Sequence, residues 1–314
     1  MTSGLDSLAA VQQYGRERPF RAGPAGARPA GDAGKAPMTL AEAKPRDLPG
    51  PQRARGEVGL SARLDQGVTR LSHLRQVGSL KALFPRPAGS ALEAVTLNTA
   101  GGLTGGDRMR LEARAGDGAH LVLATQAAER AYRALGETTA SVKARLSAGE
   151  GARIDWLPQE TILFDGARLQ RRLLVDLAPT ATCLLVEPLL FGRRARGEEL
   201  REGFFADRWE VRRDGRLLFA DALRLSGDLS ATLDRAPVAG GARAVASLLL
   251  AGDAASAHLA GIRALLPPGG AASLIEDGLL FARLLAPDGF ALRRALVPLI
   301  VRLTGQPVPK VWSL

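Results

Sequence analysis

Polar and apolar residues alternate with a period of two along most of the chain between residues 56 and 226. Such alternation is typical of strands that bury one face of a sheet and expose the other. Glycine, proline and aspartate separate the alternating runs, and the Asp-Gly pair at positions 214 and 215 predicts a two-residue hairpin turn. The predicted strands are 56–64, 91–97, 120–125, 138–146, 152–157, 167–177, 181–186, 205–213 and 216–224.

A helical spacing of apolar residues occurs in segments 126–135, 253–266 and 287–304. Asp253 is placed to cap the second of these helices, and Asp288 lies near the start of the third, which would end before Gly305. Pro298 would kink or split the third helix, because proline lacks the backbone N–H that a helix interior uses. Between the last two helices, residues 272–285 predict a strand or a hairpin.

Three apolar runs end on a polar residue in a similar way, at Gln126, Gln159 and Glu187, which are 33 and 28 positions apart. Repetition at this spacing is compatible with β coils that stack on one another. The sequence therefore predicts a mainly β protein of stacked β-sheets, in an arrangement compatible with solenoid-like β coils. A few α-helices accompany them, two of them near the C-terminus.

The composition changes sharply along the chain. Residues 1–55 are expected to form a disordered extension, because glycine, proline and alanine dominate it and cannot bury enough apolar surface to offset the entropy of ordering. Residues 56–314 are expected to form a single β-rich domain, whose C-terminal part, about 243–314, has α/β character.

The charge is strongly basic, with 42 Lys and Arg against 32 Asp and Glu and a net charge of +10. The basic residues are dispersed beside carboxylates and aromatic residues make up only 4%, which disfavours nucleic-acid binding and leaves an acidic protein partner open. No apolar run approaches transmembrane length and the N-terminus has no signal-peptide core, so we expect a cytoplasmic protein without membrane contact.

The single cysteine, Cys183, excludes a disulfide or a thiolate metal cluster within one chain. It lies in an apolar run, which predicts a buried strand residue rather than a nucleophile. His73, His120 and His258 are far apart and have no helical pairing, so a histidine metal site is not predicted. Because the chain also lacks a Gly-x-Ser-x-Gly elbow, we expect a scaffold and not an enzyme.

A glycine-rich segment at positions 98–108 contains four glycines, Gly101, Gly102, Gly105 and Gly106. It lacks the Lys-Ser/Thr ending of a phosphate loop, and no clear helix follows it. Paired glycines instead predict a tight backbone crossing with left-handed conformations. Asp107, which follows them, is expected either to bind backbone amides there or to line a polar passage.

Other carboxylates follow or end the predicted strands, namely Glu160, Asp165, Glu187 and Glu198. Each one taken alone is explained as a turn or surface residue. A site built only from carboxylate oxygens would bind a metal transiently, which thiolates or several histidines would not allow.

Taken together, the motifs resemble the UreD/UreH family of urease accessory proteins. Four segments carry the resemblance: NTAGGLTGGDR at 98–108, TQAAERAYR at 125–133, WLPQETILFDGARL at 156–169 and EPLLFGRRARGE at 187–198. Four others support it, at 74–87, 207–221, 279–296 and the C-terminal PKVWSL. All eight occur in the family's order and span about residues 56–314.

The resemblance implies a mainly β, non-catalytic protein that binds the urease apoprotein and UreF, which recruits the GTPase UreG. It also implies delivery of nickel to urease through an internal passage, with no tightly bound cofactor and only transient Ni²⁺. The candidate passage residues are the carboxylates within the matched motifs, Asp107, Glu160, Asp165, Glu187 and Glu198. Two alternatives stay open: a scaffold for another metallocofactor of iron–sulfur type, and a basic nucleic-acid-binding protein.

Overall fold

The computed structural model describes residues 52–86, 89–193 and 197–313. The predicted disordered extension, residues 1–55, lies outside the described residues as far as residue 51, and the first strand begins at Arg55.

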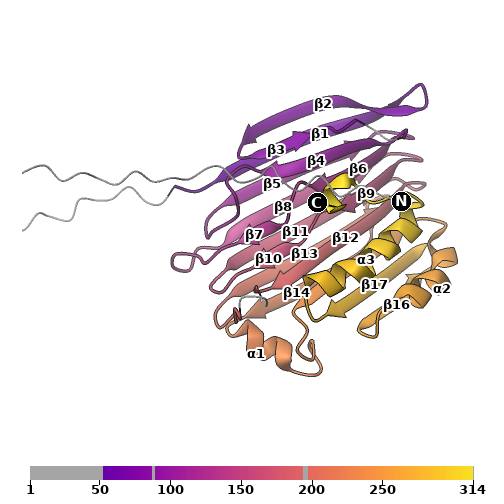
Figure 1. Cartoon of the computed structure of the whole chain (residues 1–314). Helices are drawn as coiled ribbons and strands as arrows, with labels where there is room; N and C mark the ends of the chain where they lie inside the picture. The colour runs from indigo at the N-terminus through magenta and orange to yellow at the C-terminus, as the bar shows by residue number, and fades with distance from the viewer. Residues whose placement is uncertain (1–51, 87–88, 194–196, 314) are drawn as a thin grey trace, which may run out of the picture. The chain divides into compact units, whose positions relative to one another are not determined.

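Two β-sheets lie face to face in the described part of the chain (Figure 1). The seven-stranded sheet has the order β14-β13-β11-β8-β5-β1-β2. Its strands are β1 (Arg55–Asp65), β2 (Val68–Gly78), β5 (Arg108–Ala115), β8 (Ala140–Ala148), β11 (Arg168–Leu177), β13 (Phe204–Arg213) and β14 (Arg216–Ser226).

The ten-stranded sheet follows the order β16-β17-β15-β12-β9-β6-β4-β3, and β10 pairs with both β12 and β7 beside this path. Its strands are β3 (Leu80–Leu83), β4 (Leu92–Asn98), β6 (His120–Thr125), β7 (Glu129–Ala131), β9 (Arg153–Leu157), β10 (Thr161–Leu163), β12 (Thr182–Phe191), β15 (Ala244–Ala251), β16 (Gly270–Glu276) and β17 (Leu279–Ala286).

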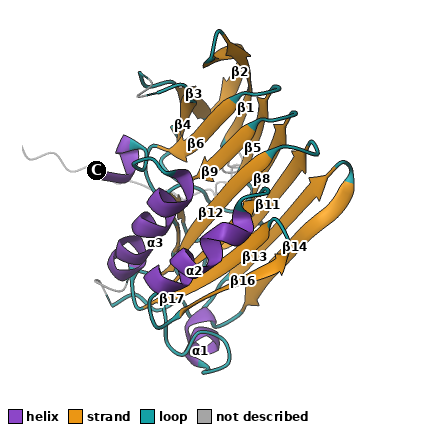
Figure 2. Ribbon diagram, turned by 90° about the vertical axis from the view of Figure 1, so that its right-hand side faces the viewer, coloured by secondary structure: helices purple, strands orange, loops and turns teal. Residues whose placement is uncertain are grey.

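Between β5 and β13 the chain crosses repeatedly from one sheet to the other, and successive crossings stack as parallel coils (Figure 2). Leu123 pairs with Trp156, 33 positions further on, and Trp156 pairs with Leu185, 29 positions further on. These residues belong to the three similar apolar runs in the sequence. The predicted mainly β fold of stacked, solenoid-like coils is therefore confirmed.

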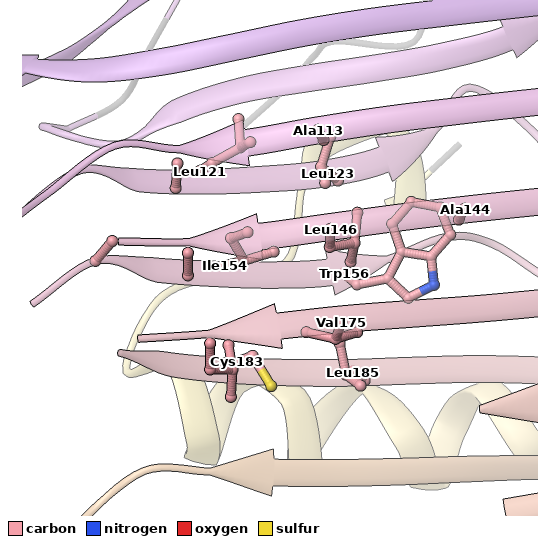
Figure 3. Packing of buried hydrophobic residues seen from close by; sticks show 14 of the residues in the cluster. Ala113, Leu121, Leu123, Ala144, Leu146, Ile154, Trp156, Val175, Cys183 and Leu185 are labelled. Atoms are coloured by element: carbon pink, nitrogen blue, oxygen red, sulfur yellow. The ribbon is translucent and has the colours of Figure 1, made fainter. Parts of the chain in front are cut away.

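Side chains that point between the two sheets form the largest core. Leu121, Leu123, Ile154, Trp156, Cys183 and Leu185 come from the ten-stranded sheet, and Ala113, Ala144, Leu146 and Val175 come from the seven-stranded sheet (Figure 3). Cys183 is fully buried, and burial raises the pKa of its thiol to about 12. The prediction of a buried strand cysteine is confirmed, and its thiol is not activated as a nucleophile.

Two helices cover the other face of the ten-stranded sheet, α2 (Ala255–Leu265) and α3 (Gly289–Thr304) (Figure 2). Both were predicted, as was the hairpin of β16 and β17 between them. Asp288 caps α3, since its carboxylate accepts a hydrogen bond from the Ala291 N–H at 2.8 Å, and Gly305 ends the helix in the left-handed region. Among the described helices, none is long and apolar enough to cross a membrane.

The predicted helices differ from the structure in two details. Of the two outcomes predicted for Pro298, a split is wrong, because α3 continues through the proline while the buried Leu296, Leu299 and Ile300 around it keep the helix packed on the sheet. Asp253 does not cap α2, whose N-cap is Ala254 without a side-chain hydrogen bond. The remaining short helix, α1 (Leu229–Asp234), was not predicted and is capped by Asp228. A 3₁₀ turn, η2 (Lys310–Ser313), ends the described chain.

The predicted helix at 126–135 is also wrong, because its centre is the short strand β7. The backbone N–H groups that a helix would use within itself bond instead to neighbouring segments. Glu129 N–H donates to the Glu160 carbonyl, and Tyr132 N–H donates to the Leu103 carbonyl. Pairing with adjacent coils therefore overrides the local helical pattern. The strands β2, β3, β5, β10 and β15 were not predicted at all.

Replacing a leucine that fills the core between the sheets should lower stability strongly. We expect Leu146→Ala to reduce the free energy of unfolding by about 2–5 kcal/mol, because Leu146 is fully buried and its loss leaves a cavity. Leu135→Ala, at a position that is 67% exposed, should change it by no more than about 0.5 kcal/mol. Urea denaturation of both variants measures the difference, and equal losses would contradict the described core.

Candidate functional site

Two cavities of about 100 Å³ each lie between the sheets. The first is lined by Glu129, Gln159 and Arg171, among others, and the second by Asp207 and Asp221. Glu187 lines both cavities. This carboxylate, one of the candidates from the sequence, therefore lies at the junction of the two spaces.

Arg171 occupies the same junction and is itself buried. Its Nη2 atom lies 2.8 Å from the Glu187 carboxylate and 2.6 Å from that of Asp207. Its Nη1 atom donates to Thr161 Oγ1 at 3.0 Å, and its guanidinium lies over the Phe205 ring at 5.3 Å. The strand alternation explains this position. Leu169 and Leu173 point into the core on either side of Arg171 in β11, so the arginine between them points inward as well.

Glu187 is held by two indole groups in addition to Arg171. Trp156 Nε1–H donates to one carboxylate oxygen at 2.9 Å, and Trp209 Nε1–H donates to the other at 3.1 Å. Burial raises the pKa of Glu187 above its ordinary value, while Arg171 opposes that rise. Burial likewise works against the charge of Arg171, but the carboxylates of Asp207 and Glu187 outweigh it and leave the arginine pKa raised.

Two buried polar atoms of this cluster, Arg171 Nε and Asp207 Oδ1, have no hydrogen-bond partner among the described residues. A buried donor or acceptor without a partner costs about 1–3 kcal/mol. Arg171 lines the first cavity and Asp207 the second. Unsatisfied hydrogen-bonding atoms on residues that line a cavity are typical of a place that takes up water or a polar solute.

Glu129 lines the first cavity and was not singled out by the sequence analysis. Burial raises the pKa of its carboxyl group, an effect that the hydrogen bonds from Asn98 at 3.3 and 3.4 Å partly offset. It was missed because its segment was predicted to be a helix. The segment instead forms the strand β7, in which Glu129 lies on the wall of the first cavity.

Asp107 and the glycines before it build the predicted crossing. Its carboxylate accepts hydrogen bonds from the Ala54 N–H and the Thr104 N–H, both at 2.8 Å. Gly101, Gly102 and Gly106 all have positive φ angles. A Cβ atom at Gly102 would lie 2.8 Å from the Arg130 carbonyl, and one at Gly105 would lie 2.3 Å from the Thr138 carbonyl. Only glycine fits this close approach of the backbone.

Glu160 lies apart from both cavities and ties the C-terminus to the ten-stranded sheet. Arg293 on α3 donates to its two carboxylate oxygens at 2.9 and 2.6 Å. The same guanidinium also donates to Gln159 Oε1 and to the Trp312 carbonyl, each at 3.0 Å. Both oxygens of the Glu160 carboxylate are therefore occupied by a bidentate ion pair with Arg293.

Asp165 and Glu198 come together at a surface depression of about 820 Å³, away from Glu187. Asp165 accepts from the Arg201 and Glu202 N–H groups and forms an ion pair with Arg133. Glu198 accepts from the Asp165 N–H at 3.4 Å and from Arg193. Burial would raise the pKa of Glu198, but its hydrogen bonds from Arg193 outweigh this and lower it.

The five candidate carboxylates thus occupy four separate places, and only Asp165 and Glu198 meet. Within the described ranges, no group of three or more His, Cys, Asp or Glu side chains is placed to hold a metal ion. What the residues do form is a buried cation, Arg171, flanked by carboxylates where two cavities share the wall residue Glu187. Such a place can hold water or a small cation in passing but does not bind it in a closed shell.

The family model for UreD urease accessory proteins matches residues 52–313. Similar proteins, each described as urease accessory protein UreD, occur in several bacteria. The protein from Rhizobium rhizogenes is 51% identical over 279 residues, which cover 88% of this chain and 100% of the relative. The one from Methylobacterium sp. is 49% identical over 270 residues, covering 83% and 95%. The one from Xanthobacter autotrophicus is 49% identical over 277 residues, covering 88% and 94%.

Removing the buried cation should destabilise the protein in a pH-dependent way. Arg171→Met leaves Glu187 and Asp207 without their counter-charge, so we expect a loss of about 3–5 kcal/mol in the free energy of unfolding at about pH 8. Without the arginine, the largest influence that opposes burial is lost, so the folded-state pKa of Glu187 rises further. A raised carboxyl pKa favours the folded state as the pH falls, so the deficit should shrink towards about pH 5.

Urea denaturation at both pH values measures this effect. Arg216→Met removes an exposed arginine and serves as the control, with a change of no more than about 0.5 kcal/mol. A deficit in Arg171→Met that is independent of pH would show that the cluster does not hold Glu187 as described.

Proposed function

Since the chain belongs to the UreD family of urease accessory proteins, we propose that it binds the urease apoprotein and the UreF–UreG assembly and conveys nickel to the urease active site. Its family membership supports the broader role in urease maturation. The proposal of nickel transfer is based on the interior of the protein, where carboxylates line two neighbouring cavities.

The observation that carries the transit proposal is the position of Glu187 on the wall of both cavities. A Ni²⁺ ion moving as cargo between them would meet Glu129 and Gln159 on one side, Glu187 at the junction, and Asp207 and Asp221 on the other. Oxygen donors spread along a path suit an ion that must leave again, because no single point offers a complete ligand set.

Arg171 has two opposite effects on this route. Its positive charge opposes the rise in the pKa of buried Glu187 and so favours the ionised form that a metal ion would need. The same charge occupies the carboxylates that the ion would use and repels a divalent cation. We therefore propose that transit requires Arg171 to release Glu187 or Asp207, and that Arg171 acts as a positioning residue for passage.

Asp107, Glu160, Asp165 and Glu198 stay predictions as passage residues. Their carboxylates already bind backbone N–H groups or arginines, which suits a structural contribution to the loops around the route. An iron–sulfur scaffold finds no support in Cys183, because its thiol is buried and its pKa is raised to about 12.

Neutralising the carboxylate at the junction should reduce nickel transfer without breaking the assembly. Glu187→Gln keeps the size of the side chain and an oxygen that the indole groups can bond, but removes the charge that attracts a cation. We expect the nickel content of urease matured with this variant to fall roughly tenfold or more. Metal analysis of urease purified from cells that express the complete set of maturation proteins measures it.

Glu137→Gln changes an exposed carboxylate and should leave the nickel content unchanged. Co-purification of both variants with urease and UreF shows whether the assembly is intact. Full nickel loading with Glu187→Gln in an intact assembly would rule out a route through this junction.

A further inference from the structure

The outward face of the seven-stranded sheet carries an unusual row of charges. Parallel pairing places Arg110 of β5 beside Lys143 of β8, Lys143 beside Arg172 of β11, and Arg172 beside Arg208 of β13. Neighbouring strands are about 4.8 Å apart, so four cations line up at that interval. All four side chains are exposed. Like charges directly opposite each other on adjacent strands destabilise a sheet, so this row lowers stability and calls for another reason.

The next two rows along the same four strands do not cancel this charge. They add three arginines, Arg114, Arg145 and Arg212, and three carboxylates, Glu112, Asp176 and Glu210. Seven cations thus face three anions in three consecutive rows, which we call the basic face. Glu210 alone lies within 2.8 Å of both Arg172 and Arg208 and within 3.5 Å of Arg212. Hydrogen bonds from Arg172 and Arg208 lower its pKa, so it stays ionised and is shared by three arginines.

Several cations of the basic face have no carboxylate of their own. Among the described residues, no ion pair includes Lys143 or Arg114. In the described part of the chain, α2 and α3 pack on the ten-stranded sheet. These helices therefore do not cover the basic face, which lies on the seven-stranded sheet. An excess of positive charge on an open, regular surface attracts an anionic partner and accelerates its docking.

The size and pattern of the face favour a protein over a nucleic acid. The outward face of the whole seven-stranded sheet, of which the basic face is a part, has strands spaced by about 4.8 Å that each contribute about eight residues at about 3.3 Å, which gives roughly 750 Å². That area is close to the roughly 800 Å² that each partner contributes to a standard interface. The carboxylates set among the arginines would repel a phosphate backbone, and the three rows contain no aromatic side chain on which bases stack.

We propose that the basic face is the docking surface for an acidic protein surface, and this rests on the proposed function, which places the chain in an assembly with other proteins. The acidic partner supplies carboxylates to Lys143 and Arg114, which have none of their own among the described residues, and to Arg172, which shares Glu210 with two other arginines. Its own positive groups meet Glu112 and Asp176, so the register of charges selects the orientation of the partner.

Reversing the central charge of the row separates docking from folding. Lys143→Glu places a carboxylate between Arg110 and Arg172, its partners in register on both sides. The sheet then gains two favourable neighbours, so the Tm should stay unchanged or rise, whereas an acidic partner should bind at least roughly tenfold more weakly. A structural role alone predicts no loss of binding from a variant that is not destabilised. Lys310→Glu, which makes the same charge change on η2, is the control.

The experiment measures binding of the full chain to immobilised urease apoprotein and, separately, to UreF, at low and high salt. The expected result is tenfold weaker, less salt-dependent binding to one of them by Lys143→Glu alone. Lys143 should also be protected from acetylation in that complex. Equal binding by the wild type and Lys143→Glu overturns the docking proposal and leaves the proposed function standing.

Two other outcomes are informative in different ways. Binding of the wild type to neither protein would overturn the proposed function and the docking proposal together. Salt-dependent binding to double-stranded DNA, lost in Lys143→Glu while urease and UreF still bind, would assign the basic face to nucleic acid and overturn the protein partner.

Discussion

The in-register stacking of parallel coils is the constraint on which the other features of this protein depend. In each coil a given position lies beside the same position of the next, so side chains of one kind collect into rows. On the inside this gives the row Leu123, Trp156 and Leu185, which packs the core (Figure 3). On the outside it gives the row of Arg110, Lys143 and Arg172. A slip of one residue would exchange the two faces, so the apolar rows fix the position of the charged ones.

The buried cluster shows how the same register serves the interior. Arg171 and Asp207 are direct neighbours on the paired strands β11 and β13, and Glu187 reaches them from β12 in the opposite sheet. The arginine therefore joins both sheets through charge, at a depth where the other inward positions of β11 are leucine and valine. A buried ion pair seldom adds stability over apolar packing, because desolvation offsets much of the attraction. Its position between two cavities is more simply explained by what those cavities hold or pass.

Much of the fold follows from local pattern, because alternation marks which strands have one buried face. The strand β5 alternates perfectly between charged and apolar residues, so its pattern was present in the sequence, but the strand was not predicted. The segment around Glu129 has a helical pattern, yet hydrogen bonds from neighbouring coils make it a strand. Local pattern cannot include these bonds, because they come from residues about 30 positions away.

The site could be predicted in part, because charged residues at inward-facing positions of a strand can be recognised from the alternation of the sequence. Glu187 stood out because a carboxylate ends an apolar run, but the same logic extends to Arg171, which occupies an inward position between Leu169 and Leu173. A buried charge implies a buried counter-charge, although sequence alone does not say which strand supplies it. Asp207 and Glu187 supply that counter-charge, and Arg171 in turn supplies the positive charge that these buried carboxylates require. Burial raises the pKa of Glu187 and so disfavours the charged form that binds a cation, whereas the arginine that blocks the junction opposes this rise.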